Sequence, residues 1–159
     1  MSETREFQTS SPEETEALGE ALAALLGPGD VVALDGELGA GKTCFVRGLA
    51  RGLGCRTAVS SPTFQLMHTH AGRVPLYHLD AWMTERGEGF LADGGAEWLT
   101  GDGVAAVEWA GHVAGWLPDA RFEVRLAHAG EERRSVAVRW TGPGSRLGPL
   151  GGPKIERKA

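Results

Sequence analysis

The segment from Gly36 to Thr43 constrains the fold more than any other part of the chain. It reads GELGAGKT and matches the phosphate-binding loop pattern, in which GxxxxGK is followed by Ser or Thr. Such a loop joins a buried strand to the start of a helix, and both neighbours are present here. The apolar run Val31–Leu34 predicts the strand, and residues from about Lys42 to Leu53 predict the helix. The chain is therefore expected to contain a P-loop within an α/β fold.

The residues of this loop predict how a nucleotide would be held. Glycines let the backbone curl so that successive N–H groups point at phosphate oxygens, and the helix adds its positive N-terminal end. Lys42 is expected to reach the β and γ phosphates, and the Thr43 hydroxyl is expected to bind Mg²⁺. We expect ATP rather than GTP as the ligand. The loop residues expected to contact it are Glu37, Leu38, Gly39, Ala40, Gly41, Lys42 and Thr43.

Two carboxylates at the ends of apolar segments are candidates for completing the site. P-loop sites need a carboxylate near Mg²⁺, usually at the end of a neighbouring strand. Asp80 ends the segment Val74–Leu79, and Glu108 ends the run Val104–Val107. One is expected to hold the metal, directly or through water, and the other to orient or deprotonate the attacking water. Without a P-loop in the chain, each would be an ordinary surface acid at a strand end.

The order of elements predicts a single compact P-loop domain with a mixed, partly parallel central sheet. A capped helix is expected to start at Ser11, and an antiparallel hairpin is expected to turn at Ala71-Gly72. A second, closing hairpin is expected from Arg121–Leu126 and Ser135–Trp140.

Glycine-rich stretches, within a total of 24 glycines, predict irregular structure elsewhere. The acidic segment from Met83 to Asp102 is expected to contain a short helix near Ala96–Leu99. The domain is expected to span residues 1–141. Residues 142–159 are rich in Gly, Pro and charge, which predicts a flexible C-terminal tail.

Composition argues against several classes of protein. The net charge is −5, whereas a protein that wraps nucleic acid usually has a basic excess. No apolar run approaches the ~20 residues of a membrane span, and the polar N-terminus does not resemble a signal peptide. Cys44 and Cys55 show no zinc spacing, and His68, His70 and His78 without cysteines do not suggest a zinc site. We expect a cytoplasmic protein with no membrane association and no zinc.

Absent motifs narrow the class of nucleotide-binding protein. The chain contains no asparagine, so the NKxD motif that reads guanine in G-domains cannot be present. It has no LSGGQ segment, which argues against an ABC-type ATPase, and no arginine-rich lid of the kind typical of small kinases. Two alternatives to an ATPase stay open. One is a small-molecule P-loop kinase, and the other is a binding module in which ATP shifts partner affinity without being hydrolysed.

Several motifs occur together in one order along the chain. They are Thr15–Gly19, Leu38–Thr43, Phe45–Leu49, Ser61–Phe64, Tyr77–Asp80 and Val107–Trp109. With them, the chain from about Phe7 to Trp140 resembles the TsaE (YjeE) family, the ATPase component of bacterial tRNA threonylcarbamoyladenosine synthesis. A P-loop alone would be generic, but the SPTF and EW segments together make the match specific.

The resemblance implies a compact P-loop fold that binds ATP and Mg²⁺. It also implies action beside a TsaD–TsaB pair, which installs threonylcarbamoyl on adenosine 37 of tRNAs that read ANN codons. Contact with tRNA would be indirect, through that complex. Carried over to this sequence, Lys42 grips phosphate, Thr43 binds Mg²⁺, and Thr63 belongs to a switch-like segment near the γ-phosphate. Asp80 and Glu108 serve the metal and the water.

Three positions depart from the family pattern. The family usually continues past Asp80 as Leu-Tyr-Arg, whereas this chain has Ala81–Met83 and no arginine. The family often has a second acid after the EW segment, where this chain has Ala110-Gly111. Cys44 replaces a common second threonine. The first two departures concern hydrolysis and partner docking rather than phosphate binding.

Overall fold

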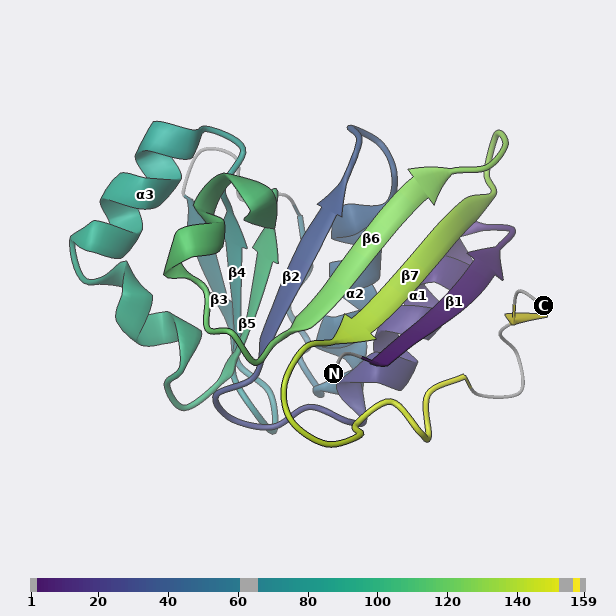
Figure 1. Cartoon of the computed structure of the whole chain (residues 1–159), viewed down its shortest axis with the longest axis horizontal. Helices are drawn as coiled ribbons and strands as arrows, with labels where there is room; N and C mark the ends of the chain where they lie inside the picture. The colour runs from purple at the N-terminus through teal and green to yellow at the C-terminus, as the bar shows by residue number, and fades with distance from the viewer. Residues whose placement is uncertain (1–2, 61–65, 152–155, 158–159) are drawn as a thin grey trace.

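A single sheet organises the computed structural model, which describes residues 3–60, 66–151 and 156–157. The sheet has eight strands in the order β3-β4-β5-β2-β6-β7-β1-β8 (Figure 1). The strands are β1 (Glu3–Thr9), β2 (Val31–Gly36), β3 (Met67–His70), β4 (Leu76–Asp80), β5 (Val104–Glu108), β6 (Phe122–His128), β7 (Arg134–Trp140) and β8 (Glu156–Arg157).

The middle of the sheet is parallel and its flanks are antiparallel. β4, β5, β2 and β6 run parallel to one another. β3 pairs antiparallel with β4 at one edge, while β7 and then β1 continue antiparallel beyond β6. The predicted mixed, partly parallel sheet is confirmed, as are both predicted hairpins. Because β4, β5 and β2 are parallel, their carboxyl ends meet at one edge of the sheet, which is where ligands bind in open α/β folds.

Helices cover the parallel strands on both faces. α1 and α2 lie behind the sheet in Figure 1, whereas α3 lies on the other side, near β3 and β4. A hydrophobic core lies on each face of the sheet, and alternate side chains of β2 belong to different cores. Val32 and Leu34 belong to the core beside α1 and α2, whereas Val31 and Ala33 belong to the core beside α3. The helices are α1 (Pro12–Ala23), α2 (Lys42–Gly52), α3 (Thr84–Ala92) and the 3₁₀ helices η1 (Gly95–Leu99) and η2 (Ala110–Trp116).

The contact between α1 and α2 is close because Gly48 has no side chain. A Cβ atom on Gly48 would lie 1.9 Å from the carbonyl oxygen of Glu16, so a larger residue would force the helices apart. α1 starts as predicted, with Ser11 Oγ accepting from the Glu14 backbone N–H at 3.2 Å. Glu14 Oε1 in turn accepts from the Ser10 backbone N–H at 2.8 Å. This packing holds α2 in place, and with it the P-loop at its N-terminus.

The expected flexible tail is wrong for residues 142–150, which we call the C-terminal strap. Leu147 and Leu150 are 0% and 1% exposed and belong to the same core as α1 and α2. Arg146 donates to both carboxylate oxygens of Asp30, at 2.8 and 2.9 Å. Its guanidinium also lies 4.8 Å from the ring of Phe122. The high Gly and Pro content of the strap predicted disorder, because composition does not register the few residues, Arg146, Leu147 and Leu150, that attach it to the domain.

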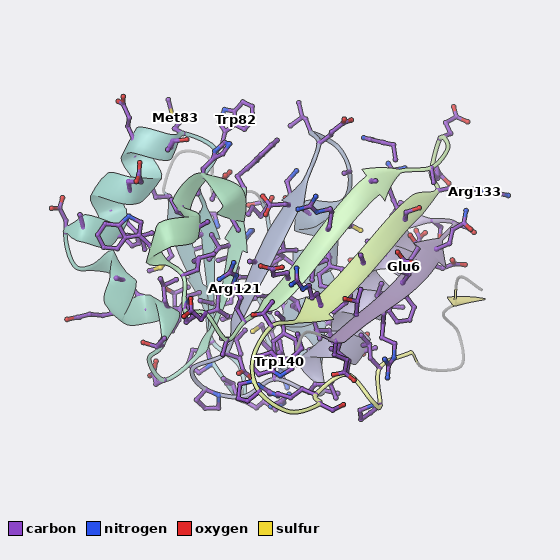
Figure 2. All side chains as sticks on the ribbon, in the orientation of Figure 1. Glu6, Trp82, Met83, Arg121, Arg133 and Trp140 are labelled. Atoms are coloured by element: carbon purple, nitrogen blue, oxygen red, sulfur yellow. The ribbon has the colours of Figure 1, made fainter. Side chains whose placement is uncertain are left out.

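The strap is also tied to β1, at the other end of the chain. Glu3 Oε2 accepts from Ser145 Oγ at 2.7 Å, and Glu3 Oε1 accepts from the backbone N–H groups of Arg146 and Leu147, both at 2.9 Å. Trp140, labelled near the lower end of β7 in Figure 2, donates from Nε1 to the carbonyl oxygen of Pro143 at 3.0 Å. The core of the domain therefore extends past the expected boundary at residue 141.

Four of the described elements were not predicted from the sequence, namely β1, α3, η2 and β8. β1 occupies the polar N-terminal segment, where only Phe7 and Thr9 are buried. α3 occupies the first half of the glycine-rich segment, and its Gly87 packs against Ala81 and Val113, whose side chains lie 3.2 Å from a Cβ placed on it. The short helix expected near Ala96–Leu99 is present as η1. Within the described residues, no helix is both long enough and apolar enough to cross a membrane.

Candidate nucleotide site

The P-loop lies between the end of β2 and the start of α2, as the sequence predicts. Gly39 and Gly41 have φ angles of +77° and +105°, a backbone region that other residues rarely adopt. Gly41 is the N-cap of α2, and its carbonyl oxygen accepts from the Phe45 N–H at 2.8 Å. The Ala40 N–H donates to the Glu37 carbonyl oxygen at 3.0 Å, so this N–H is already used inside the loop.

The hairpin formed by β6 and β7 supports the loop from the outside. His128 Nε2 lies 3.3 Å from the Leu38 carbonyl oxygen, and Arg134 Nη2 donates to the Gly39 carbonyl oxygen at 3.2 Å. Binding these carbonyl groups fixes the orientation of two consecutive peptide units at the tip of the loop. Neither contact is predictable from local sequence, because each joins positions about 90 residues apart.

Lys42 is buried at the base of the loop with its amine turned inward. Its Nζ donates to the carbonyl oxygens of Gly36 at 2.6 Å and Glu37 at 3.0 Å, and it lies 3.9 Å from the centre of the Trp109 ring. Burial lowers the pKa of Lys42, and the nearby negative charge of Glu108 partly opposes that effect. A phosphate group would replace these two neutral carbonyl oxygens with negatively charged acceptors in direct contact with the amine.

The two predicted acids lie side by side at the carboxyl ends of their strands. Asp80 on β4 is in register with Glu108 on β5, and they are 6% and 3% exposed. Thr43 Oγ1 donates to the carboxylate of Glu108, with distances of 3.1 and 3.0 Å to its two oxygens. Asp80 Oδ1 accepts from the Trp82 backbone N–H at 2.9 Å. One hydrogen bond thus links the start of α2 directly to the end of β5.

A cavity of about 460 Å³ opens over these groups. Its aromatic wall is formed by Trp82 and Trp109, whose ring centres are 4.5 Å apart. Trp109 has a φ angle of +58°, which is unusual for a bulky residue. Figure 2 shows Trp82 projecting outward at the end of the sheet where the P-loop lies. The residues lining the cavity are Leu38, Gly39, Gly41, Lys42, Thr43, Cys44, Asp80, Trp82, Glu108 and Trp109.

A comparison with protein families identifies the family to which a chain with this P-loop site belongs. The family model described as "Threonylcarbamoyl adenosine biosynthesis protein TsaE" matches residues 9–136. This chain belongs to the TsaE family. The resemblance inferred from the sequence motifs is confirmed.

Named TsaE proteins are similar to this chain over most of their length. The Bacillus subtilis "tRNA threonylcarbamoyladenosine biosynthesis protein TsaE" is 40% identical over 142 residues, which cover 88% of this chain and 87% of the relative. The Streptomyces coelicolor protein of the same name is 41% identical over 136 residues, covering 81% and 90%. A crystal structure of Bacillus subtilis YdiB matches with a TM-score of 0.78 and 36% identity, covering 89% of this chain and 88% of that chain.

Most residues expected to form the TsaE site do meet in one place. Gly39, Gly41, Lys42 and Thr43 share the cavity with Asp80, Glu108 and Leu38. Glu37 lines a neighbouring cavity instead, and the Ala40 side chain is buried in the core. Thr63 lies outside the described residues, so its role stays a prediction.

The oxygen atoms at this site suit a Mg²⁺ ion that is shared with phosphate and water better than a metal ion bound by protein side chains alone. Thr43, Asp80 and Glu108 offer a hydroxyl and two carboxylates, which are the hard oxygen ligands that Mg²⁺ prefers. Mg²⁺ usually takes only one or two protein carboxylates, with water and substrate phosphates completing its shell. In the described part of the chain, no three His, Cys, Asp or Glu residues are grouped so that they could hold a metal ion.

His78 is a contact of the site that sequence reasoning missed. Its Nε2 lies 2.5 Å from Glu108 Oε2, and its side chain is completely buried. From the sequence, His78 was expected to be structural rather than a zinc ligand, and it falls in the Tyr77–Asp80 segment of the family resemblance without an assigned role. The spacing indicates only that His78 shares a face of β4 with Asp80, which it precedes by two positions, and gives no sign of the contact with Glu108 on β5.

Proposed function

We propose that this chain is a Mg²⁺-dependent ATPase of tRNA threonylcarbamoyladenosine synthesis. In this proposal it acts beside a TsaD–TsaB-type complex that modifies adenosine 37 of tRNAs reading ANN codons, and it meets tRNA only through that complex. Membership of the TsaE family supports the pathway. The observation that carries the ATPase activity is the hydrogen bond from Thr43, in the P-loop, to Glu108 at the end of β5. It places a buried carboxylate beside the phosphate-binding element, where this group can orient or deprotonate the attacking water.

The side chains of the site have separate roles in this proposal. Lys42 exchanges its carbonyl partners for the β and γ phosphates of ATP. Thr43 and Asp80 hold Mg²⁺, which neutralises the negative charge of the phosphates when bound. Glu108 holds the metal through water or accepts a proton from the attacking water. The chain lacks the arginine that usually follows Asp80 in the family, so turnover without a partner is expected to be weak.

Replacing Glu108 by Gln tests this assignment directly. The amide keeps the shape of the side chain but cannot act as a base, so turnover is expected to fall by about 10²–10⁴-fold, the usual contribution of a positioned base. Binding of ATP in the absence of Mg²⁺, measured by calorimetry, should change little because Lys42 and the loop are intact. Glu88 is exposed on α3 and serves as the control, since Glu88→Gln should leave phosphate release unchanged. Unaltered turnover in Glu108→Gln would remove Glu108 from the mechanism.

The same assay separates the two alternative functions. A small-molecule kinase would form ADP only when a hydroxyl or phosphate acceptor is added, and it would need no protein partner. A non-hydrolysing binding module would bind ATP and release no phosphate under any condition. The hydrogen bond between Thr43 and Glu108 favours an ATPase over a non-hydrolysing binding module, which needs no carboxylate base beside the metal ligand. A kinase can use such a base on its acceptor hydroxyl, so against a kinase the proposal is supported by membership of the TsaE family.

A further inference from the structure

A chain of three buried or half-buried side chains runs from the sheet to the P-loop. His78 on β4 contacts one oxygen of Glu108 on β5, at 2.5 Å. Thr43 at the start of α2 donates to the same carboxylate at 3.0 and 3.1 Å. Glu108 is therefore held from two sides, by a hydroxyl from the loop and by an imidazole from the neighbouring strand.

The strand register explains why the imidazole reaches Glu108. His78 and Asp80 share one face of β4, and on β5 they are in register with Ala106 and Glu108. Ala106 has only a methyl group, which leaves room for the ring of His78 to lean along the sheet toward Glu108. Both strands are completely buried here, so the contact is shielded from water.

The second ring nitrogen of His78 shows which atom carries the proton. Nδ1 is buried and has no hydrogen-bond partner among the described residues. A buried N–H without an acceptor is costly, whereas Nε2 faces a carboxylate oxygen that must accept. The arrangement therefore favours the tautomer with its N–H on Nε2, donating to Glu108.

We propose that His78 is a positioning residue for the ATPase reaction. Its Nε2–H fixes the rotation of the Glu108 carboxylate, so that this group faces Thr43 and the metal site instead of turning within the sheet. This inference rests on the proposed function, because it assigns His78 to the same site. It deepens that function by adding a support for Glu108 from the neighbouring strand to the one that Thr43 gives from the P-loop.

The first experiment compares two amides at position 78. The Gln amide nitrogen can reach the position of Nε2, whereas the Asn amide is shorter and cannot. His78→Asn should lower kcat by about 10- to 100-fold, the usual cost of losing an outer-shell partner, while KM for Mg²⁺-ATP rises by no more than about 10-fold. His78→Gln should restore most of kcat. The matched control is His70→Asn, since His70 is also a buried histidine, lies on β3 and bonds Thr57 rather than Glu108.

Equal losses of kcat in His78→Asn and His78→Gln would overturn the proposal. They would mean that an amide nitrogen at the position of Nε2 restores nothing, so that the imidazole serves packing and not the position of Glu108. Unchanged kcat in His78→Asn would overturn it as well. A readout without turnover is the nitrogen and proton NMR spectrum of the wild-type imidazole. We expect the proton on Nε2, shifted downfield by its hydrogen bond to the Glu108 carboxylate, and we expect that shift to shrink in Glu108→Gln. A proton on Nδ1 would overturn the proposal.

Binding of Mg²⁺-ADP separates this inference from the proposed function. The measured quantity is the ratio of the ADP affinities with and without Mg²⁺. If His78 positions Glu108, this ratio should be about 10-fold smaller in His78→Asn than in the wild type, and His78→Gln should retain the wild-type ratio. A wild-type chain that releases no phosphate would refute the ATPase proposal, but the NMR and binding results would still decide whether His78 positions Glu108. Equal Mg²⁺ dependence in wild type and His78→Asn would count against the inference alone.

Discussion

Leu147→Ala tests whether the C-terminal strap is part of the folded domain. Leu147 is 0% exposed and packs in the core beside α1 and α2. Removing a buried leucine side chain costs about 2–5 kcal/mol, depending on how far the site can collapse. The strap lies near the end of the chain and can relax, so we expect about 3 kcal/mol. For a domain of this size that loss should lower Tm by roughly 6–12 °C.

The assay is thermal and urea unfolding followed by circular dichroism. The matched control is Gly148→Ala in the same strap, because a Cβ at Gly148 meets nothing within 4 Å. That substitution should change the free energy of unfolding by no more than about 0.5 kcal/mol. If Leu147→Ala and Gly148→Ala are equally stable, the strap does not contribute to the core and the reasoning from its burial is wrong.

Two further predictions concern stability. Gly48→Ala should destabilise the protein by about 1–3 kcal/mol in urea unfolding, because the new Cβ would overlap Glu16, whereas Gly89→Ala, with open space around it, should be neutral or stabilising. The pKa of Glu3 is lowered, chiefly by the hydrogen bond from Ser145, so folding favours its ionised form. Its contribution is complete above the ordinary pKa of about 4.3 and is lost as pH falls through the lowered value. The difference in Tm between wild type and Glu3→Gln should therefore be largest near pH 7 and shrink toward pH 3, and a constant difference would contradict this.

The phosphate-binding part of the site could be predicted because its signals are local. The loop, its lysine and its threonine lie within eight consecutive residues, and the physics of phosphate binding fixes their types and order. Asp80 and Glu108 were predictable for a related reason. Each ends a short apolar run, and parallel strands bring their carboxyl ends to one edge.

Contacts that depend on strand register could not be predicted in the same way. The pairing of His78 with Glu108 requires β4 and β5 to be neighbours with His78 opposite Ala106. Neither fact follows from the spacing of residues along the chain. The supports that His128 and Arg134 give to the P-loop have the same origin, since the β6–β7 hairpin must first fold beside β2.

Composition gave the wrong prediction for the C-terminal strap, where a few side chains that pack on the domain lie among glycine and proline. The strap from Gly142 to Leu150 looks like a tail because its two buried leucines are isolated and show no period. The side chain that fixes it, Arg146, finds its acceptor in Asp30. Long-range ion pairs of this kind leave no local pattern that a reading of the sequence could use.

The central claim is that this TsaE-family chain hydrolyses ATP as the partner of a tRNA-modifying complex. The most direct test is steady-state phosphate release from Mg²⁺-ATP, first with the chain alone and then with a TsaD–TsaB pair added. We predict weak release alone and clear stimulation by the pair, with both lost in Glu108→Gln. Bound ATP without phosphate release, in the presence and in the absence of the pair, would contradict the claim.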